Sequence, residues 1–520
     1  MKFSRLMLFT AAVAVMVTTS SCTKKQNELN VKDSESKYGN TYPIQTDETL
    51  TMWANFSLDP KYKKFEEQPL YQELYKRTGI KVEYMIPTGD AKEQFNLLIA
   101  SGDYPDIIAY NWYDCVGSPS KALAEKIIIP LNDIIKAYAP NANKLFEENQ
   151  SIKHYISDGG EYYSFPSFVE DNSQMVYSGP IIRSDLLDKF NLTAPETIEE
   201  WEKVLRIFKN NGIKSPLTIL GKTLSSELTN TFIFGSFNTA YKYYVKNDGS
   251  ITYGPVEPEF RGAIELLRSW YQEGLLDAEF ASADDDLVQK KITDGSAGAT
   301  VHYVSRIARW NNASSGEAKF AGIAYPALEK GKPAEFSQLD TMGKGLSAAI
   351  TTSCDNLELA AKYLDYGYSD EGILLFNYGI EGETYTMDSG NAMFKSEYLN
   401  DFDRLNPFTC LHLTMHEVNR FNQRNQMKEQ QDAIKSWTTD MSKHLIPAIT
   451  PTTEEAETIV ALTNSINTYS DEMILKFIVG YESMDKYDSF VNQLKALGVD
   501  TVIKTQQAQL ERFNNRVGGQ

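Results

Sequence analysis

The stretch TLTMWANFSLDPKYKKFEEQPLYQELYKRTGIKVEYMIPTGDAKEQFNLLIASGDYPDIIAYNW (49–112) decides the fold. It holds three apolar, strand-like segments, at 49–56, 80–87 and 105–112. Helical patterns separate them, at 60–78 and 90–101. Strands that alternate with crossover helices indicate an α/β protein with a parallel sheet, whose ligands bind at the carboxyl ends of the strands.

Polar and aromatic residues gather where these strands end. Because parallel strands end at one edge of the sheet, such residues are candidates for a binding site. They are Trp53 and Asn55 after the first strand, and Asn111, Trp112 and Asp114 after the third.

The rest of the chain is more mixed. An extended, turn-rich segment covers 162–182, and amphipathic helical patterns cover 197–212 and 259–276. The last third is mostly helical, with periodic runs at 356–377, 412–443 and 453–479. No repeat of fixed period is present, and 520 residues suffice for two or three domains or one large two-lobed unit.

The N-terminus, MKFSRLMLFTAAVAVMVTTSSC, predicts export. Its apolar run, 6–17, is too short to span a bilayer and follows two basic residues, which is the layout of a signal peptide over 1–21. Cys22 directly follows small residues, so we expect it to be lipidated; the alternative is an ordinary cleaved signal. The polar stretch 22–47 then predicts a flexible tether, and both alternatives place the protein outside the cytoplasm.

Composition excludes several classes of partner. The net charge is −19, and −21 once Lys2 and Arg5 leave with the signal, which disfavours nucleic acids and anionic lipid surfaces. Besides Cys22, the cysteines are Cys115, Cys354 and Cys410, an odd number at wide spacing. We therefore expect buried free thiols, with one bridge possible, and no zinc site.

Six segments in the same order resemble the extracellular solute-binding proteins of ABC sugar importers, in the lipoprotein branch (family 1). They are ASGDYPDII (100–108), EYYSFPS (161–167), IIRSDLLDKFNLTAPETIEEW (181–201), GSAGATVHYVSRIARW (295–310), YGIEGETYTMDSG (378–390) and KFIVGYESMDKYDSFVNQLKALGVD (476–500). Each segment alone is weak evidence for this resemblance, and the strong evidence is that all six occur in the same order along the chain.

The resemblance implies a two-lobed, periplasmic-binding-protein-like fold of type II, each lobe a mostly parallel sheet flanked by helices. The lobes are expected to alternate along the chain: 48–174 in lobe 1, 175–338 in lobe 2, 339–372 in lobe 1, and 373–520 in lobe 2 with extra C-terminal helices. The family often has an acidic calcium loop after the helix at 197–209. Here that stretch reads NNGIKSPLTI (210–219) without an acidic residue, so neither calcium nor any cofactor is carried over.

Sugars present apolar faces and a rim of hydroxyls, so their sites combine aromatic rings with carboxylates, amides and arginine. By resemblance, the strand-end residues above face the ligand. For each aromatic residue, packing in the core is the competing interpretation, and Glu381 is explained equally well by bracing its loop. The other residues that the resemblance implies are Glu170, Asp171, Tyr303, Arg306, Trp310, Asp340, Glu381 and Tyr385.

The protein is predicted to be a monomeric lipoprotein that captures a carbohydrate, specifically an oligosaccharide, and delivers it to an ABC permease. Two alternatives remain open: a secreted carbohydrate-active enzyme, which needs two carboxylates at defined separation, and a sensor subunit of the same fold. A peptide or polyamine ligand is a further possibility. His412 and His416 lie four residues apart on an expected helix, a spacing that can bind zinc, but no third zinc ligand is evident. The acidic run 284–286 is expected to be the solvated start of a helix and not a metal site.

Overall fold

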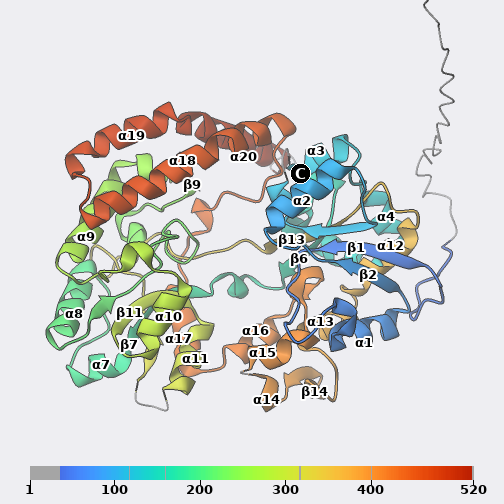
Figure 1. Ribbon diagram of the computed structural model, residues 1–520, viewed down its shortest axis with the longest axis horizontal. Coiled ribbons are helices and arrows are strands. Elements are labelled where there is room, and N and C mark those ends of the chain that lie inside the picture. The colour runs from blue at the N-terminus through green and yellow to red at the C-terminus, as the bar shows by residue number, and fades with distance from the viewer. Residues whose placement is uncertain (1–35, 116–117, 159, 315–317, 400, 518–520) are drawn as a thin grey trace, which may run out of the picture. The chain divides into compact units, whose positions relative to one another are not determined.

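The computed structural model describes residues 36–520, apart from 116–117, 159, 315–317, 400 and 518–520. These residues form one compact unit, built on two separate main sheets (Figure 1). In the described part of the chain, no helix combines the length and the apolar character needed to cross a bilayer. The predicted signal peptide and Cys22 lie outside the described residues.

The first sheet has six strands in the order β16-β6-β13-β3-β1-β2. β1 is parallel to both β2 and β3, which confirms the parallel arrangement predicted for 49–112. β13 arrives late in the chain and inserts, antiparallel, between β3 and β6. The strands are β1 (Thr49–Ala54), β2 (Lys81–Met85), β3 (Ile107–Tyr110), β6 (Phe165–Val169), β13 (Gly343–Ile350) and β16 (Met415–His416).

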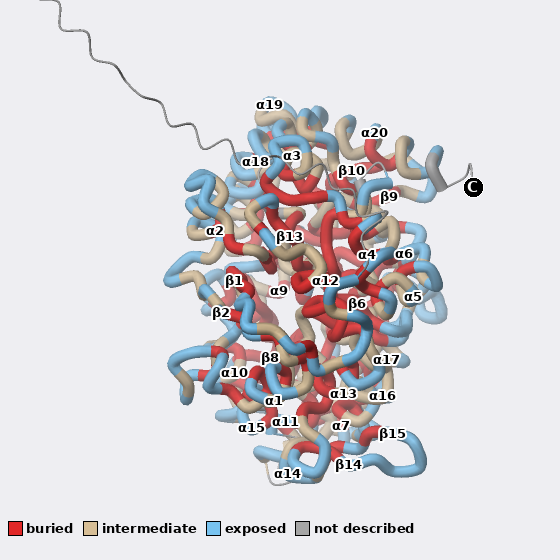
Figure 2. The backbone as a smooth tube through the Cα atoms, turned by 90° about the vertical axis from the view of Figure 1, so that its right-hand side faces the viewer, coloured by how far each residue is buried: buried red, intermediate tan, exposed pale blue. Residues whose placement is uncertain are grey.

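Burial follows the strands of this sheet. All residues of β3 and β6 are buried, and Figure 2 shows buried backbone concentrated at β6 and β13. The helices of this part of the chain are α1 (Pro69–Thr78), α2 (Ala91–Ser101), α3 (Ser118–Ala124), α4 (Asn132–Tyr138), α5 (Pro140–Glu148), α6 (Gln150–Tyr155), α12 (Leu357–Tyr366), α13 (Asp370–Tyr378), α14 (Ser396–Leu399), α15 (Phe402–Leu405) and α16 (Val418–Arg424). Two hairpins join them: β4 (Ser157–Asp158) with β5 (Glu161–Tyr162), and β14 (Tyr385–Asp388) with β15 (Asn391–Phe394).

The second sheet has four strands in the order β12-β7-β11-β8. It is mixed rather than mostly parallel, because β7 is antiparallel to both β11 and β12 and only β8 is parallel to β11. β7 follows an extended connection, not a crossover helix, so nothing requires it to run parallel. The strands are β7 (Ser178–Arg183), β8 (Ser215–Leu217), β11 (Ala297–Tyr303) and β12 (Phe320–Gly322).

Helices surround this second sheet, and three C-terminal helices pack together (Figure 1). α18 matches its predicted bounds because Thr452 and Glu455 form a capping box at its start and Gly480 ends it in the left-handed conformation. The elements are α7 (Ser184–Lys189), α8 (Ile198–Asn210), α9 (Pro258–Gln272), α10 (Asp285–Thr293), α11 (Ser305–Ala313), α17 (Lys428–Trp437), α18 (Thr453–Val479), α19 (Tyr487–Ala496), α20 (Val499–Val517) and the hairpin β9 (Tyr243–Val245) with β10 (Ile251–Tyr253).

Two expected boundaries differ from the structure. Residues 373–520 were expected wholly with the second lobe, whereas β16 pairs with β6 in the first sheet. The expected tether, 22–47, already contacts the folded unit from residue 36. Ser36 Oγ donates to Glu358 Oε1 at 2.6 Å, and the Ile44 amide donates to the Thr78 carbonyl at 2.8 Å. These contacts are possible because Ile44 supplies an apolar side chain that α1 and its surroundings bury.

Other expectations have clear outcomes. Cys115, Cys354 and Cys410 are buried free thiols, as predicted. The helical run expected at 412–443 is interrupted, because His412 lies in a short 3-10 turn and His416 in β16. The acidic run at 284–286 starts α10, where Asp284 accepts a hydrogen bond from the Leu287 amide as predicted for a helix cap.

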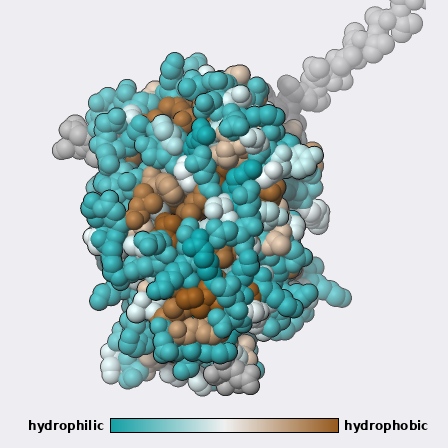
Figure 3. Space-filling view, turned by 90° about the vertical axis from the view of Figure 1, so that its left-hand side faces the viewer, coloured by the Kyte–Doolittle hydropathy of each residue, from teal (hydrophilic) through white to brown (hydrophobic). Residues whose placement is uncertain are grey.

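The surface agrees with the composition. The face shown in Figure 3 is mainly hydrophilic, with separate hydrophobic areas, in a chain of which 23% of residues are charged. A charged exterior of this kind supports solubility and does not by itself indicate a partner.

Candidate binding groove

Three cavities with polar linings lie along one edge of the first sheet. β1, β3, β6 and β16 all run in the same direction, so their carboxyl ends meet at this edge. Three cavities open along it, and neighbouring cavities share lining residues. Asp340 lines the first and the second, and Arg420 lines the second and the third. We call this series of cavities the groove.

The first cavity has a volume of about 490 Å³ and follows the end of β3. Tyr113 and Tyr155 supply aromatic surface, with ring centroids 5.4 Å apart. The Tyr155 hydroxyl accepts a hydrogen bond from the Gly345 amide at 2.8 Å. Gly343 makes room for this ring, because a Cβ there would lie 2.5 Å from it. Its lining is Asn111, Tyr113, Tyr155, Glu227, Asp340, Thr341, Gly343, Gly345, Pro447, Ala448 and Ile449.

Two carboxylates in this cavity are tied to one phenol. The Tyr177 hydroxyl lies 3.0 Å from Glu227 Oε2 and 3.2 Å from Asp340 Oδ2, and its proton is shared between them. Tyr303 donates to the other oxygen of Glu227 at 3.1 Å. Burial, together with the negative charge of Glu227, raises the pKa of Tyr303 to about 12, so this phenol stays a donor at neutral pH.

A cation balances these carboxylates. Burial lowers the pKa of the half-buried Lys242 to about 8, while the charges of Asp340 and Glu227 oppose the shift. The ammonium therefore remains mainly protonated at pH 7. The carboxylates, phenols and amide that line this cavity supply both donors and acceptors for a polyhydroxy ligand.

The second cavity, of about 240 Å³, lies where β6 and β16 end. Glu417 is half-buried there, and burial raises the pKa of its carboxyl. The His416 ring lies 2.8 Å from the Ser167 hydroxyl and 2.7 Å from the Leu411 carbonyl oxygen. The lining is Val169, Gln174, Tyr177, Asp340, His416, Glu417, Arg420 and Phe421.

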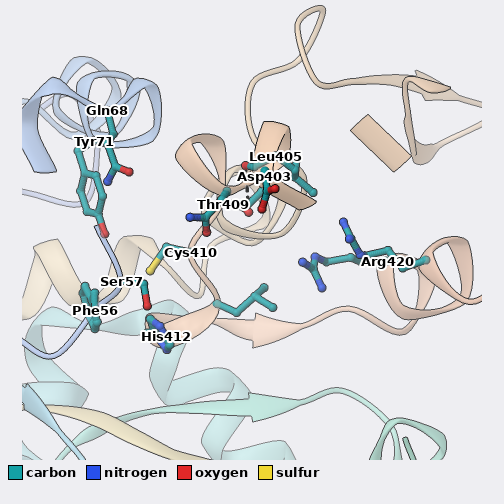
Figure 4. Close-up of a pocket in the computed structure, with 13 residues that line it drawn as sticks. Phe56, Ser57, Gln68, Tyr71, Asp403, Leu405, Thr409, Cys410, His412 and Arg420 are labelled. Carbon is teal, nitrogen blue, oxygen red and sulfur yellow. Dashed lines mark hydrogen bonds between the residues drawn. The ribbon is translucent and has the colours of Figure 1, made fainter. Parts of the chain in front are cut away.

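The third cavity, of about 470 Å³, is shown in Figure 4. Phe56, just after β1, stacks on His412 with ring centroids 4.9 Å apart and an angle of 16°. Burial lowers the pKa of His412 to about 4, so this imidazole is neutral at pH 7. Figure 4 shows Arg420 directed toward the space that this pair, Thr409 and Asp403 surround.

The structure brings only some of the predicted residues together. Asn111 and Asp340 line the first cavity, and Tyr303 joins them through Glu227. Arg306 instead pairs with Asp285 at 3.0 Å. Glu170 accepts a hydrogen bond from the Val418 amide at 2.8 Å, close to the second cavity.

Four predicted aromatic residues lie in the core. Trp53 is inside β1 rather than after it and packs on Phe95 and Tyr110. Trp112 is fully buried beside Phe95. Trp310, with Nε1 donating to Gln289 at 3.0 Å, and Tyr385, in a cluster with Tyr378, are also buried.

The remaining predicted residues have local roles or lie apart. Asp171 caps a 3-10 turn, accepting from the Ser173 amide at 2.8 Å, which lowers the pKa of its carboxyl. Glu381 is exposed, and its backbone forms an isolated β-bridge with Tyr385. The backbone amide of Asn55 donates to the Ala109 carbonyl. The side chain of Asp114 lies outside the described part of the chain.

Sequence reasoning missed several groove residues. Tyr155, Tyr177, Glu227, Arg420 and the segment 447–449 come from distant parts of the chain and carry no common motif. Only Tyr113 had a local signal, as a neighbour of predicted residues at the end of β3. Within the described residues, no group of three or more metal-ligating side chains is present.

Comparison with known proteins establishes the class. The family profile of bacterial extracellular solute-binding proteins matches residues 60–373, so the chain belongs to this family. It is similar to the fructooligosaccharide ABC transporter substrate-binding protein FusA of Streptococcus pneumoniae, with 27% identity over 72% of this chain and 70% of that protein.

Solved structures confirm the expected fold, of the type II periplasmic-binding-protein-like kind. The alginate-binding protein AlgQ2 without calcium matches with a TM-score of 0.74 and 23% identity, over 91% of this chain and 100% of that one. A solute-binding protein of Bifidobacterium longum infantis, described as binding HMO, matches with a TM-score of 0.75 and 17% identity, over 89% and 99%.

Proposed function

We propose that this protein captures an oligosaccharide in the groove and delivers it to an ABC importer permease. The observation that carries the proposal is the chain of three cavities at one sheet edge, lined by tyrosines, carboxylates and an arginine. An elongated groove of this kind suits a ligand of several sugar units, each with an apolar face and hydroxyls. The similarity to FusA supports a carbohydrate as the ligand.

The first cavity is lined by residues that follow strands of the first sheet and of the second sheet. A ligand that contacts both can therefore change the conformation of the protein. Asn111 follows β3 of the first sheet, and Glu227 follows β8 of the second. A sugar that contacts both binds better when they approach each other, so it shifts the protein toward a closed form. The permease would recognise that form. We further propose a lipid on Cys22 as the anchor and a monomeric state, with no cofactor and no catalytic turnover.

A saccharide panel tests the proposal. A ligand present at 100 times its dissociation constant is expected to stabilise the folded protein by about 2.7 kcal/mol, seen as a rise in melting temperature. The protein is used with Cys22 replaced by serine, which keeps it free of lipid. No shift with any mono- or oligosaccharide, and a shift with peptides or polyamines, would reject the sugar assignment. Loss of intact sugar during incubation would instead identify an enzyme.

Glu227 provides a test of the groove itself. Glu227→Gln is expected to weaken binding of the sugar about 10-fold, because a charge-assisted hydrogen bond is replaced by a neutral one. Glu199→Gln, on the exposed start of α8, makes the same charge change away from the groove and is the matched control. Titration calorimetry measures both. Equal affinities for the two variants would place the ligand elsewhere.

A further inference from the structure

The third cavity contains two arginines of one helix. Arg420 and Arg424, one turn apart on α16, both line it. Burial lowers the pKa of Arg420 to about 10 and that of Arg424 to about 9, the latter also through the charge of Arg420. Two guanidinium groups in one partly desolvated cavity give it a positive charge that favours an anionic group of a ligand there.

Arg420 is placed to receive such an anion. Its Nε donates to the Asn377 carbonyl at 2.9 Å, which fixes the direction of the side chain. Its two terminal nitrogens make neither a hydrogen bond nor an ion pair with the residues that the structure describes. Figure 4 shows the guanidinium directed to the cavity. The acidic residue of the lining, Asp403, is exposed.

The other lining residues suit a sugar. Ser57, Gln68 and Thr409 offer hydroxyl and amide groups, and the stacked Phe56–His412 pair offers apolar surface. Because Arg420 also lines the second cavity, a group bound by this arginine can belong to a ligand that continues along the groove. A planar guanidinium matches a planar carboxylate with two parallel hydrogen bonds.

We propose that the third cavity holds the carboxylate of a uronic acid unit, so that the ligand of the groove is an acidic oligosaccharide. The proposal rests on the proposed function and makes it specific. The chain's net charge of −19 repels anions in general, so selection for this carboxylate comes from Arg420 and Arg424 locally.

Matched ligands and matched variants test it. Trimers of galacturonate, glucuronate and mannuronate, and the methyl ester of each, are titrated by calorimetry into the purified protein. At least one free acid is expected to bind 10-fold or more tightly than its ester. Arg420→Gln is expected to remove that preference, Arg420→Lys to keep part of it, and Arg404→Gln to leave it unchanged. Arg404 is a suitable control because it is exposed and pairs with Asp401.

The outcomes separate this inference from the proposed function. Neutral oligosaccharides that bind while no acid is preferred over its ester would overturn the inference and leave the function standing. No binding of any saccharide would overturn both. Equal weakening of acid and ester by Arg420→Gln, with an unchanged melting temperature, would show that Arg420 shapes the groove and would overturn the inference. A shift with citrate or acetate alone, and none with uronates, would also overturn it.

Discussion

Trp437→Ala is expected to lower the free energy of unfolding by about 3–5 kcal/mol, the usual cost of deleting a large buried aromatic side chain. Trp437 ends α17 and lies flat against β7. Its side chain is fully buried, and Nε1 donates to the Ile323 carbonyl at 2.9 Å. Gly179 of β7 permits this approach, because a Cβ there would lie 2.5 Å from the indole. The loss would be measured as a lower urea midpoint.

Two further variants make this prediction specific. Trp437→Phe keeps most of the apolar volume and is expected to cost less than the alanine variant. Gly179→Ala leaves Trp437 in place but is expected to destabilise the fold through a clash with the indole. If Trp437→Ala changed the midpoint by the equivalent of less than about 1 kcal/mol, the contact between α17 and β7 would not stabilise the second sheet.

Acid is expected to destabilise the protein through His412, by up to about 3 kcal/mol. Burial lowers the pKa of this imidazole to about 4, below its ordinary value of 6.5. The unfolded chain therefore binds the proton first, and stability that is present above pH 6.5 is lost as the pH falls through 4. The measurement is the urea midpoint at several pH values between 7 and 4.

His412→Phe isolates this contribution. Phenylalanine can stack on Phe56 as the imidazole does but cannot be protonated. The variant is expected to lose less stability than the wild type between pH 7 and pH 4. Identical pH curves for wild type and His412→Phe would mean that other groups cause the acid sensitivity.

The fold was predictable where its signals are local. β1, β2 and β3 came from apolar segments separated by helical patterns, and α18 from its capping residues and final glycine. The segment 339–372, which contains β13, was expected with the first lobe and lies there, although its place between β3 and β6 was not predicted. β16 was not predicted as a member of the first sheet, because its pairing depends on a partner far away in the sequence. A strand of two residues, such as β16, has no periodicity to detect.

The candidate site was harder to predict for a related reason. A residue near the end of a strand can face the groove or the core, and the sequence does not distinguish them. Asn111 lines the first cavity, while Trp112, the next residue, packs on Phe95 in the core. Glu227 is recognised from its place in the first cavity and from its hydrogen bonds with Tyr177 and Tyr303, which join three distant segments.

The position of β13 also bears on the order of assembly during synthesis. This strand is central in the first sheet but begins only at residue 343, more than 230 residues after its neighbour β3 ends. Until it emerges, β3 and β6 lack the partner that joins them, so the early part of the chain has no complete sheet. Such non-local pairing slows folding.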